Sequence, residues 1–371
     1  MDGREELKMN STEKHARWLI GQIESGRMSR RAFMGRTAAL GMTLGAAPGL
    51  LSEAQAATPK RGGHMRLAMG HGGTSDTLDP ATIANGIQWT AVYGVSNTLT
   101  EVDCIDNVEL RTLSMLQRNP DVIIEEGAGP LHYSLPMLGA VAPFDNPDLR
   151  KALKFAIDRQ DILDKILFGH GVIGNDHPIG PSYRYHAADI EQNSYDPDKA
   201  RYHWQQSGLG DITLDLSAAE AAFGGAVDAA VLYQASAKKA GININVVREV
   251  NDGYWSDVWM KKPWSASYWG GNATEDAMFS TAYAAGAAWN ESQWDNPRFN
   301  ELLRSARAEL NEGLRAEMYR EMQILLRDEG SVIIPMFANS VHARNDKIAH
   351  GDVSWVRGFD GRRIMERWWM V

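Results

Sequence analysis

Alternation between helical and strand-like segments is the feature of this chain that most limits its fold. Beyond residue 145, segments whose apolar residues recur at helical spacing are separated by short apolar runs of strand length. The expected helices cover residues 146–157, 162–169, 198–206, 226–240, 296–310 and 311–327, and the expected strands cover residues 212–216, 242–247 and 331–337. Such alternation predicts an α/β architecture.

The part of the chain before residue 145 is expected to be richer in strands. We expect strands over residues 63–69, 122–126 and 131–137, and helices over residues 83–93 and 107–117. The first strand opens into a loop, residues 70–80, that is rich in Gly, Ser and Asp and therefore irregular. The loop lacks the GxxxxGKS/T and GxGxxG spacings of nucleotide-binding loops, so it does not predict a nucleotide site.

Length and charge limit the domain count and the partners. With 371 residues, 44% of them hydrophobic, the chain can bury a sizeable core and is expected to fold as two domains or lobes. Its formal net charge is −9, and residues 57–371 alone carry −11, because residues 1–56 hold eight Lys and Arg against six Asp and Glu. This balance argues against nucleic acid or an anionic membrane surface as a partner and is compatible with neutral or cationic solutes. The single cysteine, Cys104, excludes a disulfide within the chain and a multi-cysteine metal site.

The N-terminal segment has the order of parts found in an export signal. Arg30 and Arg31 are followed by the weakly apolar run 38–51, and residues 54–56, Ala-Gln-Ala, are the small residues that a signal peptidase accepts. This order resembles a bacterial twin-arginine signal, which would send the chain to the periplasm with cleavage near Ala56. The apolar run has 14 residues. Spanning a bilayer takes about 20.

Half of the chain's 12 tryptophans lie between residues 254 and 294, together with three tyrosines. Large rings beside Gly270, Gly271 and the amide of Asn272 suit a concave binding site, where rings give apolar contact and closely approaching backbone gives hydrogen bonds. The same composition is typical of a Trp-rich core or of a seam between domains. From this stretch alone both interpretations stay open.

Several motifs occur together in a fixed order. Residues 143–159, PFDNPDLRKALKFAIDR, contain Leu-Arg-x-Ala-Leu-x-x-Ala-Ile-Asp-Arg, and weaker marks are residues 78–80 (LDP), 195–200 (YDPDKA) and 239–242 (KAGI). As a set they resemble the extracytoplasmic solute-binding proteins of peptide, opine and nickel ABC importers, family 5, whose most specific signature is the first of these motifs. The likeness covers essentially everything after residue 57.

The resemblance implies a two-lobe, periplasmic-binding-protein-like α/β fold of type II, in the large peptide-binding class. The two lobes are joined by a hinge and close on a ligand. Residues 1–56 would form an N-terminal extension and the export signal, 57–142 the first lobe, 143–340 the second lobe and 341–371 the return to the first lobe.

The function that the resemblance implies is that of the substrate-binding component of an ABC transporter. Such a protein captures a peptide, an opine or a similar small polar solute in the periplasm and delivers it to the permease and ATPase subunits. The expected form is a monomer that binds no nucleic acid.

One departure from the family lies between Asp103 and Cys104. At the equivalent position, family members carry further first-lobe strands and a small accessory domain, about 100–150 residues. We therefore expect an internal deletion at about 103–104 and an incomplete first lobe, with sheet edges or apolar surface uncovered. The alternative function is a truncated homologue that no longer binds ligand and survives as a non-enzymatic interaction protein or a non-functional one.

The ligand site is expected at the glycine-rich end of the tryptophan stretch. In peptide-binding members of the family, an Asp that follows a Trp after two residues often holds the α-amine of the ligand. Here that place is taken by Asn272, whose amide brings no charge, so the anchor is weakened unless Glu275 or Asp276 substitutes. Tyr254 and Trp255 are assigned to packing. The candidate ligand contacts are Trp269, Gly270, Asn272, Trp289 and Asn290 from the second lobe, and His71, Gly72, Thr74 and Ser75 from the first-lobe loop.

No catalytic motif stands out. The ten histidines include no HExxH pair, no serine lies in a GxSxG elbow, and Cys104 has no activating sequence context, so we predict neither enzyme activity nor a cofactor. His71 and His170 each lie between two glycines. Isolated loop histidines are more often polar surface than ligands, so no metal site is predicted.

Overall fold

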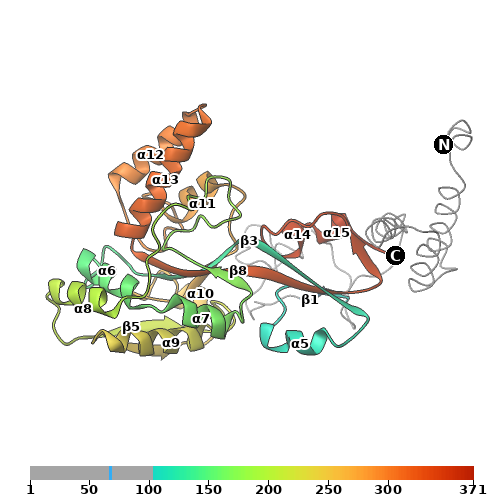
Figure 1. The fold of residues 1–371 in the computed structure, drawn as a ribbon, viewed down its shortest axis with the longest axis horizontal. Coiled ribbons are helices and arrows are strands. Elements are labelled where there is room, and N and C mark those ends of the chain that lie inside the picture. The colour runs from blue at the N-terminus through green and yellow to red at the C-terminus, as the bar shows by residue number, and fades with distance from the viewer. Residues whose placement is uncertain (1–66, 69–102) are drawn as a thin grey trace, which may run out of the picture. The chain divides into compact units, whose positions relative to one another are not determined.

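The computed structural model describes residues 67–68 and 103–371 of the chain (Figure 1). These residues belong to two compact units. The larger unit takes its described residues from Met65–Asp346 and Gly351–Arg367, and those of the smaller unit are Lys347–His350 and Trp368–Val371. The predicted export signal and the predicted helix over 83–93 lie outside the described residues.

Helices and strands alternate beyond residue 145, as the sequence predicts. In chain order the elements are β1 (Leu67–Ala68), β2 (Cys104–Ile105), η3 (Leu110–Thr112), α5 (Leu113–Leu116), β3 (Val122–Pro136), α6 (Pro147–Ala156), α7 (Arg159–Ile166), β4 (Gly171–Ile173), α8 (Pro197–Gln206), β5 (Thr213–Ala218), α9 (Ala226–Lys239), β6 (Asn243–Arg248), α10 (Tyr254–Asp257), β7 (Ser267–Trp269), α11 (Glu275–Ala282), α12 (Pro297–Ala308), α13 (Glu312–Glu329), β8 (Val332–Asn345), β9 (Ile348–His350), α14 (Gly358–Arg362), α15 (Ile364–Arg367) and β10 (Trp368–Met370).

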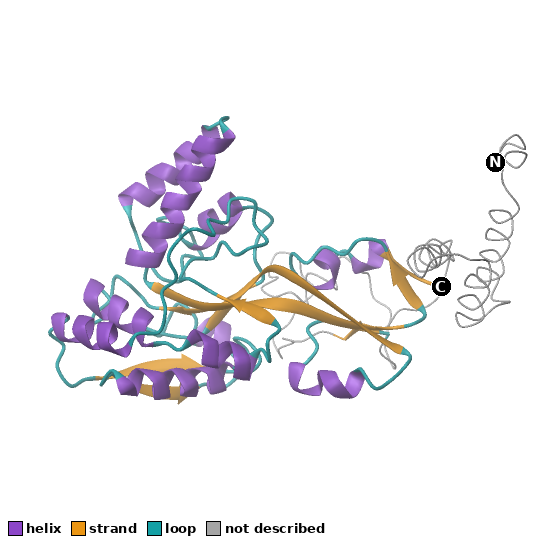
Figure 2. Cartoon of the chain, in the orientation of Figure 1, coloured by secondary structure: helices purple, strands orange, loops and turns teal. Residues whose placement is uncertain are grey.

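The larger unit is built on two sheets (Figure 2). The first has six strands in the order β1-β2-β8-β3-β7, with β4 also paired to β8. Its centre is a long antiparallel ladder between β3 and β8, which runs from the pair Val122–Asn345 to the pair Pro136–Val332. The second sheet is the parallel pair β5–β6, with α9 packed against it. In the smaller unit, β9 and β10 pair antiparallel.

One prediction about this sheet was wrong. The sequence predicted separate strands over 122–126 and 131–137, whereas the structure has the single strand β3. Within β3, a side chain at Gly127 or at Gly129 would overlap Trp355. The glycines therefore let a distant tryptophan lie directly on the strand.

The helix starts follow from local sequence chemistry. Three helices, α6, α8 and α12, begin at an Asn-Pro or Asp-Pro pair whose first side chain accepts hydrogen bonds from backbone N–H groups of the first turn. Proline is tolerated at the first helical position because its missing N–H has no partner inside the helix. These starts explain why helix boundaries in this part of the chain were predictable to within a few residues.

The signature segment 143–159 owes its residue types to buried contacts. The Nζ of Lys154 donates to the carbonyl oxygens of Leu326 and Arg327, at 3.0 and 2.8 Å, at the end of α13. Burial lowers the pKa of Lys154 to about 8. The guanidinium of Arg159 forms two hydrogen bonds with the carboxylate of Asp176, at 2.7 and 2.8 Å, and the side chains of this pair are 3% and 0% exposed. Positively charged side chains of the signature thus join α6 and α7 to the rest of the unit.

None of the helices within residues 67–68 and 103–371 is both long and apolar enough to cross a membrane.

Replacing Asp176 by Ala should destabilise the protein strongly. The change leaves the buried Arg159 guanidinium without its carboxylate, and breaking a buried pair from one side costs about 3–5 kcal/mol. Urea unfolding followed by circular dichroism measures the loss. As a control, Glu321→Ala removes the exposed partner of Arg298 and should cost about 1 kcal/mol or less. Equal losses for the two variants would contradict the structural role of the Arg159–Asp176 pair.

The buried histidines predict sensitivity to acid. Burial lowers the pKa of His132 to about 4 and that of His177 to about 3, from 6.5 for the unperturbed side chain. At a pH between the lowered pKa of the folded protein and 6.5, the unfolded chain binds more protons than the folded protein. The free energy of unfolding therefore falls as the pH drops below about 6.5.

Each histidine should account for a loss of up to about 2 kcal/mol between pH 7 and pH 5, which urea unfolding at the two pH values measures. The His132→Gln variant should show a shallower dependence on pH over this interval. An unchanged slope in the variant would refute the contribution of His132.

Candidate ligand-binding site

Three of the predicted contacts, Trp269, Gly270 and Asn272, lie at the end of β7 and in the segment that follows it. β7 is an edge strand that pairs antiparallel with β3, and Trp269 lies opposite His132. Gly271 has a positive φ of 74°, and a side chain there would overlap Pro130 of β3. Glycine is therefore required where the chain leaves the sheet.

The tryptophans of this region form a contiguous aromatic wall, made of Trp255, Trp259, Tyr268, Trp269 and Trp289. Ring centroids are 6.5 Å apart for Trp259 and Trp269, 6.4 Å for Trp259 and Trp289, and 6.0 Å for Trp269 and Trp289. Trp255 extends the wall through contacts with Trp259 and Tyr268. Trp269 is 9% exposed and Trp289 is 53% exposed, so the wall reaches from the core to the surface.

A buried carboxylate holds this wall in place. Glu291 is 1% exposed and accepts hydrogen bonds from the Nε1 of Trp259 at 2.7 Å, the Nε1 of Trp269 at 2.9 Å and the Oγ of Ser134 at 2.9 Å. Burial raises the pKa of the Glu291 carboxyl, and the hydrogen bonds from the two indoles and the serine oppose that shift. Both indole rings are therefore fixed by a single acceptor.

Sequence reasoning missed Glu291. It lies next to the predicted contacts Trp289 and Asn290, but an acidic residue in a loop gives no sign that it will be buried.

The polar end of the site is formed by Asn272 and Arg357. The backbone N–H of Asn272 donates to the hydroxyl of Tyr183 at 3.2 Å, and its Nδ2 donates to the carbonyl oxygen of Ala277 at 3.2 Å. The Oδ1 of Asn272 accepts from the Nη2 of Arg357 at 2.5 Å, and the Nε of Arg357 donates to the carbonyl oxygen of Gly271 at 3.3 Å. Arg357 was not predicted. The placement of residues 341–371 in a return segment was the one signal that could have pointed to it.

The remaining second-lobe candidate, Asn290, supports its own loop. It is 6% exposed, and its Nδ2 donates to the carbonyl oxygens of Ala284 and Trp294 at 3.2 and 2.8 Å. Its Oδ1 accepts from the hydroxyl of Ser292 at 3.1 Å. The candidates His71, Gly72, Thr74 and Ser75 lie outside the described residues.

The acidic groups considered as substitutes for a missing Asp are engaged elsewhere. Glu275 accepts from the backbone N–H of Tyr185 at 2.7 Å, and Asp276 pairs with Arg307 at 2.6 Å. Tyr254, which the sequence assigned to packing, is 1% exposed.

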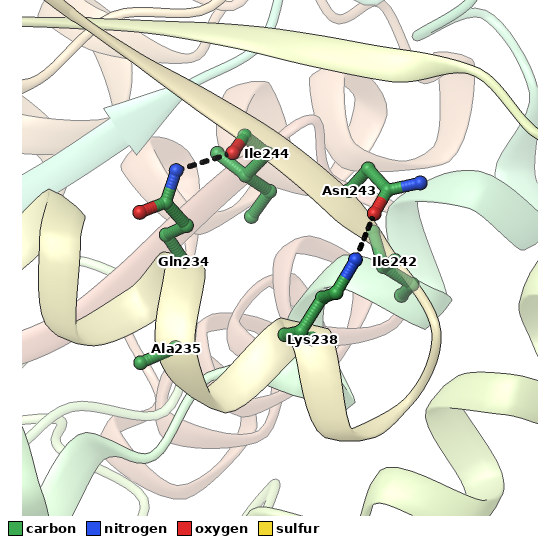
Figure 3. Close-up of a pocket in the computed structure, with 6 residues that line it drawn as sticks. All are labelled: Gln234, Ala235, Lys238, Ile242, Asn243 and Ile244. Atoms are coloured by element: carbon green, nitrogen blue, oxygen red, sulfur yellow. Dashed lines mark hydrogen bonds between the residues drawn. The ribbon is translucent and has the colours of Figure 1, made fainter.

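Two surface hollows of the described region lie away from the aromatic wall. One of about 320 Å³ lies between α9 and β6 (Figure 3), and its polar side chains are already bonded, Gln234 to the carbonyl oxygen of Ile244 at 2.6 Å and Lys238 to Asn243 at 2.7 Å. Another of about 620 Å³ is lined mainly by polar residues at the start of α6, in the segment before α12 and at the end of α13. We assign the ligand to neither.

Within the described residues, no group of three or more His, Cys, Asp or Glu side chains is arranged to hold a metal ion. The Nδ1 of His170 lies 2.9 Å from the carboxylate of Glu126, which gives this loop histidine a partner.

Replacing Glu291 by Gln should loosen the wall. The amide keeps the volume of the side chain but offers one acceptor oxygen and brings an NH₂ group against indole and hydroxyl donors, so at least one buried donor loses its partner. Such a loss costs about 1–3 kcal/mol. We expect a lower free energy of unfolding together with a weaker tryptophan signal in near-ultraviolet circular dichroism. The control Glu317→Gln changes an exposed glutamate of α13 and should alter neither. A wild-type tryptophan signal in Glu291→Gln would contradict the role given to this carboxylate.

Comparison with known proteins agrees with the fold and the signature. Residues 100–291 match the family of bacterial extracellular solute-binding proteins, family 5 middle. The dipeptide-binding protein of Escherichia coli (strain K12) is 26% identical over 207 residues, which are 52% of this chain and 37% of the relative. The di/tripeptide-binding protein 1 of Pseudomonas aeruginosa (strain UCBPP-PA14) is 25% identical over 257 residues, which are 64% of this chain and 45% of the relative. The matches thus span less than half the length of these relatives.

Solved structures share the fold. The ABC transporter-associated periplasmic binding protein DppA from Helicobacter pylori, in complex with the peptide STSA, superposes with a TM-score of 0.64 at 19% identity, over 72% of this chain and 52% of that protein. This likeness confirms the predicted two-lobe α/β fold class. With more than half of its residues matched, the chain belongs to the bacterial extracellular solute-binding proteins of family 5.

Proposed function

We propose that the chain is the substrate-binding component of an ABC transporter, which captures a peptide or a related small polar solute and delivers it to a membrane permease. The observation that carries the proposal is the aromatic wall beside the glycine-rich end of β7, which Glu291 holds and which reaches the surface at Trp289. Rings next to half-buried polar groups at Gly270 and Asn272 suit a ligand with apolar side chains and polar ends. Peptides have both.

The relatives support the same class of ligand. Several are named as dipeptide-binding, di/tripeptide-binding or peptide transport proteins, and one is named as a heme-binding protein. These names describe binding and transport, and we propose a non-enzymatic role for this chain too. We also propose export by the twin-arginine route with cleavage near Ala56, action in the periplasm as a monomer, and delivery to permease and ATPase subunits.

The second candidate is a homologue that no longer binds a solute. It rests on the predicted internal deletion at about 103–104, which would leave the wall without part of its opposing lobe. The two candidates differ in one measurable respect, because only a binding protein is stabilised by a solute.

A thermal-shift screen of the full chain against dipeptides, opines and amino acids tests the proposal. A ligand present at about 100 times its dissociation constant stabilises the folded state by about 2.7 kcal/mol, so a binding class raises the melting temperature. A transition unmoved by every solute in the screen would favour the second candidate.

The wall itself is tested by Trp289→Ala. Because Trp289 is 53% exposed, its removal should leave the melting temperature of the free protein nearly unchanged while weakening the binding of the active solute about tenfold or more. Tyr202→Ala is the matched control, since Tyr202 is an aromatic residue of α8 with 58% exposure and no place in the wall. Equal binding by both variants would remove Trp289 from the site.

A further inference from the structure

Arg357 lies across the polar end of the site. The Cγ of its side chain is 3.8 Å from the position that a Cβ of Gly270 would take, so the aliphatic stem covers a glycine. Its guanidinium reaches the carbonyl oxygen of Gly271 and the Oδ1 of Asn272, at 3.3 and 2.5 Å. The cation is therefore placed directly beside three of the residues that end β7 and follow it.

The partners of this guanidinium carry no charge. Both are neutral oxygens, and no carboxylate within residues 103–371 forms an ion pair with Arg357. Two other arginines of the same C-terminal segment differ, because Arg363 pairs with Glu366 and Arg367 pairs with Asp360. Of the five N–H donors that an arginine has, Arg357 uses two, which leaves three.

The surroundings do not neutralise the charge either. Position 272 is an amide, and neither of the next two acidic residues along the chain forms an ion pair with Arg357 within the described residues: Glu275 accepts from the backbone N–H of Tyr185, and Asp276 pairs with Arg307. Tyr183, whose hydroxyl accepts from the backbone N–H of Asn272, carries no charge near pH 7, and burial raises its pKa further, to about 12. An ammonium group at Asn272 would meet a like charge at Arg357 and an oxygen that already accepts a hydrogen bond.

We propose that this site recognises a carboxylate of its ligand through Arg357, so that the ligand class is a solute with an anionic end placed against Gly270 and Asn272. A planar guanidinium with three remaining donors matches a carboxylate in a forked, charge-assisted pair. The proposal rests on the proposed solute-binding function and specifies which group of the solute meets the polar end of the site.

Two modified peptides of one sequence separate the carboxylate from the ammonium. N-acetyl-alanyl-phenylalanine keeps the carboxylate and lacks the ammonium, whereas alanyl-phenylalanine amide keeps the ammonium and lacks the carboxylate. Isothermal titration of the full chain with each should show binding of the acetylated peptide and at least about tenfold weaker binding of the amide, as expected for loss of a charge-assisted hydrogen bond.

Two variants locate the effect. Arg357→Gln should weaken binding of the acetylated peptide by about 10- to 100-fold and abolish the difference in affinity between the two peptides. Asn272→Asp places a carboxylate against the guanidinium and should weaken binding of the acetylated peptide similarly. Because the change also removes the Nδ2 donor to the carbonyl oxygen of Ala277, the melting temperature of the variant is measured to show that it is folded. The second variant keeps the test valid if the first fails to fold. Under recognition of an ammonium, Asn272→Asp would instead strengthen binding of the amide.

The outcomes are distinct. If the wild-type chain binds the amide as well as the acetylated peptide, or if Asn272→Asp strengthens binding of the amide, recognition through Arg357 is overturned and the solute-binding function stands. If neither these peptides nor any solute of the thermal-shift screen binds the wild-type chain, the proposed function is overturned together with the inference that rests on it.

Discussion

The ladder between β3 and β8 is the constraint on which the larger unit depends. β7 is hydrogen-bonded to β3 on one side, and β2 and β4 are hydrogen-bonded to β8 on the other. Ser134, which donates to Glu291, is a residue of β3, and Trp355 lies on Gly127 and Gly129 of the same strand. The aromatic wall and the C-terminal segment are thus both positioned by contacts with β3. A change in the register of this strand would therefore move the wall and the C-terminal segment together.

Buried polar groups have two different tasks in this protein. The Arg159–Asp176 pair is held by its own ion pair and by hydrogen bonds to nearby backbone. It takes no part in the aromatic wall and keeps α7 in place. Glu291 accepts hydrogen bonds from residues of β3, β7 and the segment after α10, and the two rings that it fixes, Trp259 and Trp269, pack against the exposed ring of Trp289. A buried charge carries a desolvation cost, and three converging donors offset much of it. A carboxylate, which only accepts hydrogen bonds, suits the position of Glu291, because its three hydrogen-bond partners are all donors.

The fold was more predictable than the site. Helices such as α6 and α12 were found because Asn-Pro starts and apolar spacing act locally, within a few residues. The long strand β3 was wrongly predicted as two strands, because Gly127 and Gly129 make room for Trp355, which is more than 200 residues away in sequence. The aromatic half of the site was visible in the spacing of Trp269 and its neighbours. Its carboxylate and its arginine were not, since burial and long-range pairing leave no mark on local sequence.

The sign of the charge at the site shows how far composition can be trusted. A formal net charge of −9 suggested neutral or cationic solutes, because the charge of the whole chain sets its average field. That field is screened over about 8 Å at physiological salt, whereas a guanidinium in hydrogen-bond contact with the ligand is not. Exposed acidic residues such as Glu321 of α13 and Asp189 of a surface turn are paired with arginines. Under the proposed recognition, selectivity follows from Arg357 and its neutral partners, so an acidic protein can present a site for anions.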